Sequence, residues 1–215
     1  MDSADHADLF KPIWTSGWFT NHGPIAQQLE RELTARSSFR ECVLVGVEAI
    51  GVVMTLDCLI GKICVPNHCS MTINAQSFLN KTLCIDATGA DWLVIRSSLE
   101  VKNKATRRQK IALYLSDAAS IQTYTALLLK DELSAKILAQ TANLILFPMR
   151  SGFTIDSQGG VAILLSDAGL AAHLRNVRSS YGAGASVSVG KTANGRISEA
   201  QCLLALSGLN VSPGN

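Results

Sequence analysis

Short apolar segments alternate with segments of helical pattern along most of this sequence, and that alternation restricts its fold more than any other feature. The apolar runs expected to form strands are 41–46, 62–66, 82–86, 110–115, 144–147 and 161–165. Helices are expected at 24–33, 48–60, 71–78, 124–140, 167–178 and 198–209, after an extended arm at 1–15. Strands separated by helices predict a three-layer α/β fold with a mainly parallel sheet, as one domain spanning residues 1–215.

Composition supports a buried core and excludes several classes of function. Hydrophobic residues make up 47% of the chain and charged residues 17%, while the net charge of +2 is too small to indicate nucleic-acid binding. The longest apolar run falls short of a membrane span, and the acidic start does not resemble a secretory signal, so we expect a cytoplasmic protein without a membrane partner. Six scattered cysteines are expected to be reduced core residues, and no metal site is expected: Cys42, Cys58, Cys64, Cys69, Cys84 and Cys202.

The segment from Ser16 to Leu33 is the most specific motif of the sequence. Its first half is rich in turn-forming residues: Gly17, Asn21, Gly23 and Pro24. Its second half repeats Ile25, Leu29 and Leu33 at spacings of four, which is typical of one face of an amphipathic helix. Proline suits the first turn of this helix, because its missing N–H needs no partner there.

This segment resembles the N-terminal signature of the sugar aminotransferases of the DegT/DnrJ/StrS family, in which an SGW-hydrophobic-TN-x-GP loop leads into a helix rich in Leu and Glu. Further segments resemble family motifs in the same order, at 42–59, 62–75, 117–122, 146–165, 174–178 and 194–201. The resemblance covers most of the chain and implies the large domain of a pyridoxal phosphate (PLP) transferase. Family members are considerably longer, so it also implies that a segment around 86–117 is compressed and that the C-terminal small domain is absent.

The resemblance places Arg150 where the family has its catalytic lysine. That lysine holds PLP as a Schiff base, and an acidic group pairs with the pyridinium nitrogen. Arg150 follows Pro148 by two residues and precedes Gly159 and Gly160, and no lysine occurs between 137 and 190. Arginine stays protonated at any working pH, so it is neither nucleophile nor base. The Schiff-base chemistry is therefore expected to be lost, and Arg150 is either a solvated loop cation or a residual anion-binding residue.

At the phosphate loop, the Gly-Thr of the family falls near Glu48 and Ala49. A hydroxyl donor has been replaced there and a carboxylate has entered. A carboxylate at a helix N-terminus suits the helix dipole but competes with phosphate for the same position. Glu48 is then either a simple helix-capping acid or a competitor of the phosphate, and both interpretations predict weak phosphate binding.

Other residues match family positions less specifically. Asp117 stands for the pyridinium-pairing acid at the end of a strand, or is a helix N-cap. His68 lies where the family places a group near the cofactor ring, or is a hydrogen-bonded structural residue. Lys191, Asn194 and Arg196 lie in a Gly-rich loop that resembles the substrate-side, dimer-contacting loop of the family, or form a mobile surface loop.

Three functions are consistent with these observations. The first is a homologue of nucleotide-sugar aminotransferases without transaminase activity, acting as a partner of an intact paralogue. The second is an enzyme that holds pyridoxamine phosphate (PMP) without a Schiff base, which Arg150 fits poorly because such enzymes place a histidine there. The third is a binding module for a sugar nucleotide, with Arg150 and Arg196 contacting phosphates.

For cofactors, we expect none bound covalently and at most weak binding of PLP or PMP. For partners, we expect a homodimer or a heterodimer with a paralogue, because the composition is more apolar than that of an ordinary small domain. A missing small domain would also leave an apolar patch larger than a soluble monomer usually exposes. The residues expected there are Trp14, Trp18, Phe19, Leu203, Leu204 and Leu206.

Overall fold

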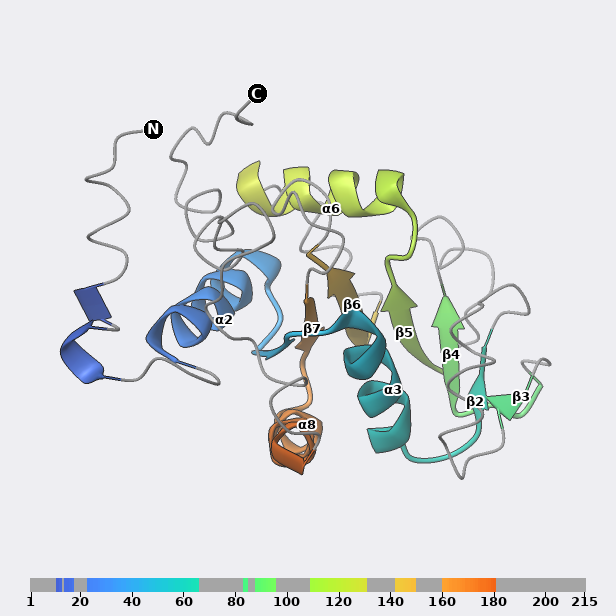
Figure 1. The fold of residues 1–215 in the computed structure, drawn as a ribbon. Coiled ribbons are helices and arrows are strands. Elements are labelled where there is room, and N and C mark those ends of the chain that lie inside the picture. Colours follow the sequence, from blue (N-terminus) through green and yellow to red (C-terminus); the bar gives the residue numbers. More distant parts are fainter. Residues whose placement is uncertain are drawn as a thin grey trace.

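A seven-stranded sheet with helices on both faces forms the described part of the chain (Figure 1). The computed structural model describes residues 11–12, 14–17, 23–65, 83–84, 88–95, 109–130, 142–149 and 160–180. The strands are β1 (Glu41–Val45), β2 (Ile63–Cys64), β3 (Leu83–Cys84), β4 (Trp92–Ile95), β5 (Lys110–Tyr114), β6 (Leu144–Pro148) and β7 (Val161–Leu165). The helices are α2 (Pro24–Ser37), α3 (Glu48–Cys58), α6 (Ala118–Lys130) and α8 (Ala168–Ser180).

The sheet is mainly parallel, as predicted, with one reversed strand. Its order is β1-β7-β6-β5-β4-β2-β3. Strands β2 to β6 pair in parallel, whereas β7 is antiparallel to both of its neighbours, β1 and β6. Because β1 and β6 both oppose β7, β1 runs in the same direction as β5 and β6. The carboxyl ends of these three strands therefore lie at one end of the sheet, where α/β proteins build their sites.

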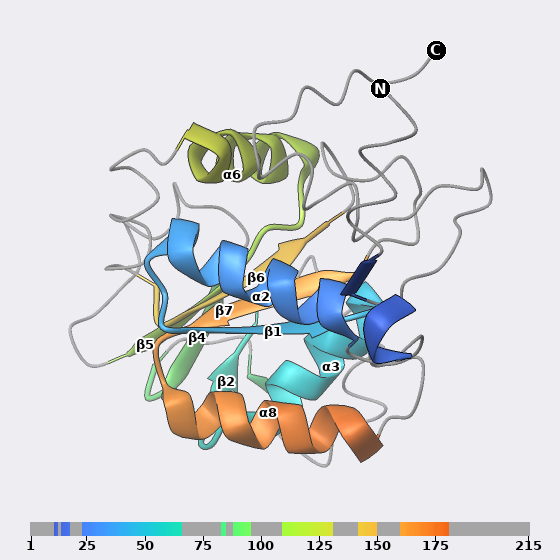
Figure 2. The ribbon, with the colours of Figure 1, turned by 90° about the vertical axis from the view of Figure 1, so that its left-hand side faces the viewer.

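Two apolar cores separate three layers, which confirms the three-layer architecture. On one face, Ile25, Leu29 and Leu33 of α2 pack with α6 and the sheet, and all three are buried. On the other face, Met54 of α3 and Leu174 of α8 pack against the opposite side of the strands. Figure 2 shows α2 and α6 on one side of the strands and α3 and α8 on the other. The predicted helix face of α2 is therefore the one that the fold buries.

Side-chain caps set the starts of two helices. Asp167 Oδ1 accepts the Leu170 N–H at 3.0 Å and so caps α8, close to the predicted start of this helix at residue 167. Asp117 Oδ1 accepts the Ser120 N–H at 2.7 Å, so α6 begins at Ala118. This start is earlier than the predicted residue 124, because the cap satisfies a backbone donor that the first turn leaves free. Proline occupies the first turn of α2, as expected.

One strand was not predicted, and one local prediction was wrong. The strand β4 was not among the expected strands, and its four buried side chains fit a strand enclosed on both faces. Residues 11–12 and 14–15 of the arm expected to be extended are helical. The helices predicted at 71–78 and 198–209 lie outside the described residues.

Three of the cysteines are described with their side chains. Cys42, Cys58 and Cys64 are buried and are not disulfide-bonded, as expected for reduced core residues. In the residues that the structure describes, no helix is long and apolar enough to cross a membrane.

Candidate functional site

The carboxyl ends of β1 and β5 bring Glu48 and Tyr114 together. Tyr114 is the last residue of β5, and Glu48 begins α3 just after β1. The Tyr114 hydroxyl donates a hydrogen bond to Glu48 Oε1 at 2.5 Å. Since these residues come from strands that run in the same direction, their contact lies at the end of the sheet expected to carry the site. Tyr114 was not among the predicted site residues.

The first turn of α3 contains the two residues that the sequence assigned to a phosphate loop. Glu48 is half-buried and Ala49 is exposed, and the preceding Val47 provides no side-chain cap. The first N–H groups of a helix have no intrahelical partner, so this turn presents backbone donors and the positive end of the helix dipole. The Glu48 carboxylate lies in that turn, held from the side by Tyr114.

Two glycines allow close packing behind this turn. A Cβ at Gly51 of α3 would lie 2.2 Å from Val161 Cγ1, and a Cβ at Gly160 would lie 2.3 Å from the Val45 carbonyl oxygen. Both distances are too short for any larger residue without movement of the backbone or of β7. Glycine at these positions therefore lets α3 and the start of β7 approach the end of β1.

The other predicted site residues have separate outcomes. Asp117 is exposed and caps α6 through Ser120, so its structural interpretation is confirmed. Its pairing with a pyridinium nitrogen stays a prediction. Five predicted residues lie outside the described part of the chain: Arg150, His68, Lys191, Asn194 and Arg196.

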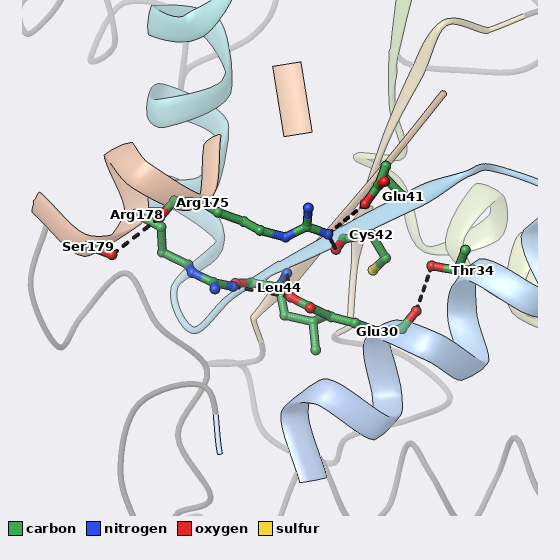
Figure 3. A network of polar contacts seen from close by, with 8 residues as sticks. All are labelled: Glu30, Thr34, Glu41, Cys42, Leu44, Arg175, Arg178 and Ser179. Carbon is green, nitrogen blue, oxygen red and sulfur yellow. Dashed lines mark hydrogen bonds and ion pairs between the residues drawn. The ribbon is translucent and has the colours of Figure 1, made fainter. Parts of the chain in front are cut away.

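A second polar cluster, which sequence reasoning missed, covers the outer edge of β1 (Figure 3). Glu30 of α2 accepts the Leu44 N–H at 2.9 Å, and Arg178 of α8 donates to Leu44 O at 2.9 Å and to Glu30 Oε1 at 3.2 Å. Arg175, one turn earlier, donates to Cys42 O at 3.1 Å and to Glu41 Oε2 at 2.8 Å. These side chains bond the outward-facing backbone groups of Cys42 and Leu44, which an edge strand otherwise leaves open.

Burial controls the ionisation of this edge cluster. Desolvation raises the pKa of Glu30, and the Leu44 N–H and the guanidinium groups of Arg178 and Arg175 oppose that rise. The pKa of the Cys42 thiol is raised well above its usual value, first by complete burial and then by the nearby Glu30 charge. A thiol with a raised pKa is a poor nucleophile, so Cys42 belongs to the packing of the edge.

Comparison with solved structures supports the fold. One match is the crystal structure of DesI in the presence of its TDP-sugar product, at 18% identity and a TM-score of 0.53, covering 97% of this chain and 59% of that chain. NtdA from Bacillus subtilis with bound cofactor PMP matches at 13% identity and a TM-score of 0.55, covering 97% and 54%. A DegT DnrJ EryC1 StrS aminotransferase from Brucella abortus matches at 15% identity and a TM-score of 0.53, covering 96% and 66%.

These matches show the fold, which is that of the large domain of PLP transferases, as the sequence predicted. This chain spans between 54% and 66% of the length of the three proteins. No protein-family model matches the sequence, and no curated protein is significantly similar to it.

Proposed function

We propose that this chain, which has the large-domain fold of the sugar aminotransferases, is a homologue of PLP-dependent nucleotide-sugar aminotransferases that lacks transaminase activity. The observation that carries the proposal is the Glu48 carboxylate in the first turn of α3, hydrogen-bonded by Tyr114. The ordered family motifs of the sequence and Arg150 at the lysine position support it.

The described residues of this turn do not fit a phosphate group. A phosphate at a helix N-terminus needs the free backbone donors and the positive end of the dipole. The side chains of this turn add to those backbone donors only the carboxylate of Glu48 and the methyl group of Ala49, and neither side chain donates a hydrogen bond. Two like charges about 4 Å apart repel by roughly 4 kcal/mol at an effective dielectric constant of about 20. That repulsion removes most of what a helix N-terminus contributes to anion binding.

Tyr114 strengthens this argument because it fixes the position of the carboxylate. A carboxylate that pointed into solvent could move aside for a phosphate, whereas one that accepts a hydrogen bond from a buried tyrosine loses that bond when it moves. With the permanently protonated Arg150 in place of a lysine, we propose that cofactor chemistry is absent here.

Cofactor binding by the purified chain tests the proposal. We expect no Schiff-base absorbance with PLP, no borohydride-trapped adduct on residues 140–165, and no saturable binding of PMP. In the variant with Glu48→Gly, Ala49→Thr and Arg150→Lys, we expect PMP binding and, with PLP, a Schiff-base band to appear. The single variant Arg150→Lys is the control, because it restores the amine while the carboxylate still opposes the phosphate. Saturable PMP binding by the unmodified chain at micromolar concentration would contradict the proposal.

We propose further that the chain associates with itself or with an intact paralogue. Trp14 is 71% exposed and Ile60 is 89% exposed, and large exposed apolar side chains are common at interfaces. Sedimentation at micromolar concentration and co-purification with a paralogue test this. A monomer that does not bind the paralogue contradicts it.

A further inference from the structure

A groove of about 470 Å³ lies on the outer side of β1, away from the turn that contains Glu48. Residues from α2, from the start of β1 and from α8 line it. Its charged and polar lining includes Gln27, Arg31, Thr34, Arg40, Glu41 and Arg175. This volume is within the range of small-molecule sites, and it exceeds what a single inorganic anion fills.

The two carboxylates at this groove already have cationic partners. Glu41 pairs with Arg175 at 2.8 Å, and Glu30 pairs with the buried Arg178 at 3.2 Å. Both arginines come from α8, as Figure 3 shows, so the negative charge of the lining is matched by that helix. The remaining charges of the lining therefore decide which ligand the groove favours.

Arg31 and Arg40 supply those remaining charges. Both are exposed and line the groove, and neither is in ion-pair contact with any acidic group among the described residues. Arg31 belongs to α2, and Arg40 directly precedes β1, so the two guanidinium groups come from different segments. The groove therefore carries an excess of two positive charges.

The floor of the groove is held in place by the edge cluster. Arg175 is fixed by Glu41 and by Cys42 O, and Cys42 and Glu30 are buried. Thr34 Oγ1 donates to Glu30 O at 2.7 Å. A ligand would thus find fixed polar walls, and only Arg31 and Arg40 would have to be ordered on binding, which keeps the entropic cost low.

We propose that this groove binds a small organic phosphate monoester. Guanidinium groups bind phosphate through paired, charge-assisted N–H···O bonds, and two unmatched arginines balance the two charges of a phosphate monoester. The volume beyond that needed by the phosphate accommodates the organic group. This site is separate from the α3 turn, so it does not depend on cofactor binding there.

Titration calorimetry on the full chain tests the site with two probes, inorganic phosphate and phenyl phosphate. We expect saturable binding of both, with phenyl phosphate the tighter. The variant with Arg31→Gln and Arg40→Gln should bind at least tenfold more weakly. Arg36→Gln is the matched control, because Arg36 belongs to the same helix, pairs with Glu32 and does not line the groove. We expect it to change the affinity less than twofold.

Three results would overturn the inference. The first is the absence of saturable binding of either probe at millimolar concentration. The second is an equal loss of affinity in the double variant and in Arg36→Gln, which would indicate a general effect of net charge. The third is phenyl phosphate binding no tighter than inorganic phosphate, which would show that the groove does not recognise the organic group. Far-UV circular dichroism of each variant verifies that it is folded, and amide chemical shifts of Thr34 and Cys42 report binding at the groove independently.

Discussion

Replacing Arg178 by methionine is predicted to destabilise the fold strongly at neutral pH. The side chain of Arg178 is 8% exposed and that of Glu30 is 11% exposed, so the pair lies in a poorly solvated region. Methionine keeps the unbranched apolar stem of the arginine side chain but removes its charge and its donors. The substitution leaves the Glu30 carboxylate buried without its cation and removes the donor to Leu44 O.

Breaking one partner of a buried ion pair costs about 3 to 5 kcal/mol, because the remaining charge stays desolvated. The pair itself contributes less than that, since desolvation offsets much of its attraction. The variant with both Arg178→Met and Glu30→Gln should therefore recover a large part of the loss. Glutamine keeps an oxygen that can accept the Leu44 N–H.

The pH dependence of the single variant provides a second test. The pKa of Glu30 is raised by burial, and Arg178 is among the groups that lower it. Removing Arg178 must raise this pKa further. A carboxyl with a raised folded-state pKa favours folding when it is protonated, and this contribution is lost as the pH rises through the folded-state pKa. Relative to the unmodified chain, Arg178→Met should therefore lose less stability at low pH than at pH 7.

Urea denaturation at several pH values measures these free energies of unfolding. The matched control is Arg175→Met, because Arg175 lies one turn earlier on α8 and pairs with Glu41. The side chains of that pair are 35% and 28% exposed, so its removal should cost about 1 kcal/mol or less. Equal costs for the two methionine variants, or a double variant no more stable than Arg178→Met alone, would refute the buried-charge reasoning.

Three further predictions concern packing, capping and association. Gly51→Ala should lower the free energy of unfolding, measured by thermal denaturation, by about 1 to 3 kcal/mol, because the new Cβ would clash with Val161. Gly169→Ala is the control and should cost less in the same assay, because its Cβ would lie 3.3 Å from Asp167 Oδ1. Asp167→Ala should cost about 1 kcal/mol through loss of the cap of α8, measured by urea denaturation, and Asp167→Ser should restore most of it. Trp14→Ser should weaken self-association in sedimentation without a change in thermal stability, because Trp14 is 71% exposed; unchanged association would place the interface elsewhere.

The sequence predicted most of the strands that contain at least four consecutive buried residues. Strands β1, β5 and β7 fall within one residue of their predicted bounds, because strands buried on both faces appear as continuous apolar runs. The sequence could not predict that β7 runs in reverse, since an antiparallel strand buried on both faces has the same apolar composition as a parallel one. The strand Trp92–Ile95 was missed because a short apolar run between polar segments carries no periodicity.

The site was only partly predictable. Glu48 and Ala49 were identified through the family motif and lie in the first turn of α3. Tyr114, the partner of Glu48, is 66 residues away in the sequence, and Arg178 is 148 residues from Glu30, so no local pattern indicates these contacts. Glu30 in particular resembles any polar residue of a surface helix, and only its contacts with the edge of β1 and with Arg178 of α8 make it a buried charge.

The closure of the β1 edge by residues of α8 also affects how the chain folds during its synthesis. Leu44 leaves the ribosome long before its partner Arg178, which lies 134 residues later. At a synthesis rate of about 5 to 20 residues per second, that interval lasts roughly 7 to 27 seconds. Throughout it, β1 lacks both its sheet neighbour β7 and the side chains that close its outer edge. The nascent chain therefore presents an unpaired apolar strand for many seconds, which makes β1 the segment where chaperone binding during translation should concentrate.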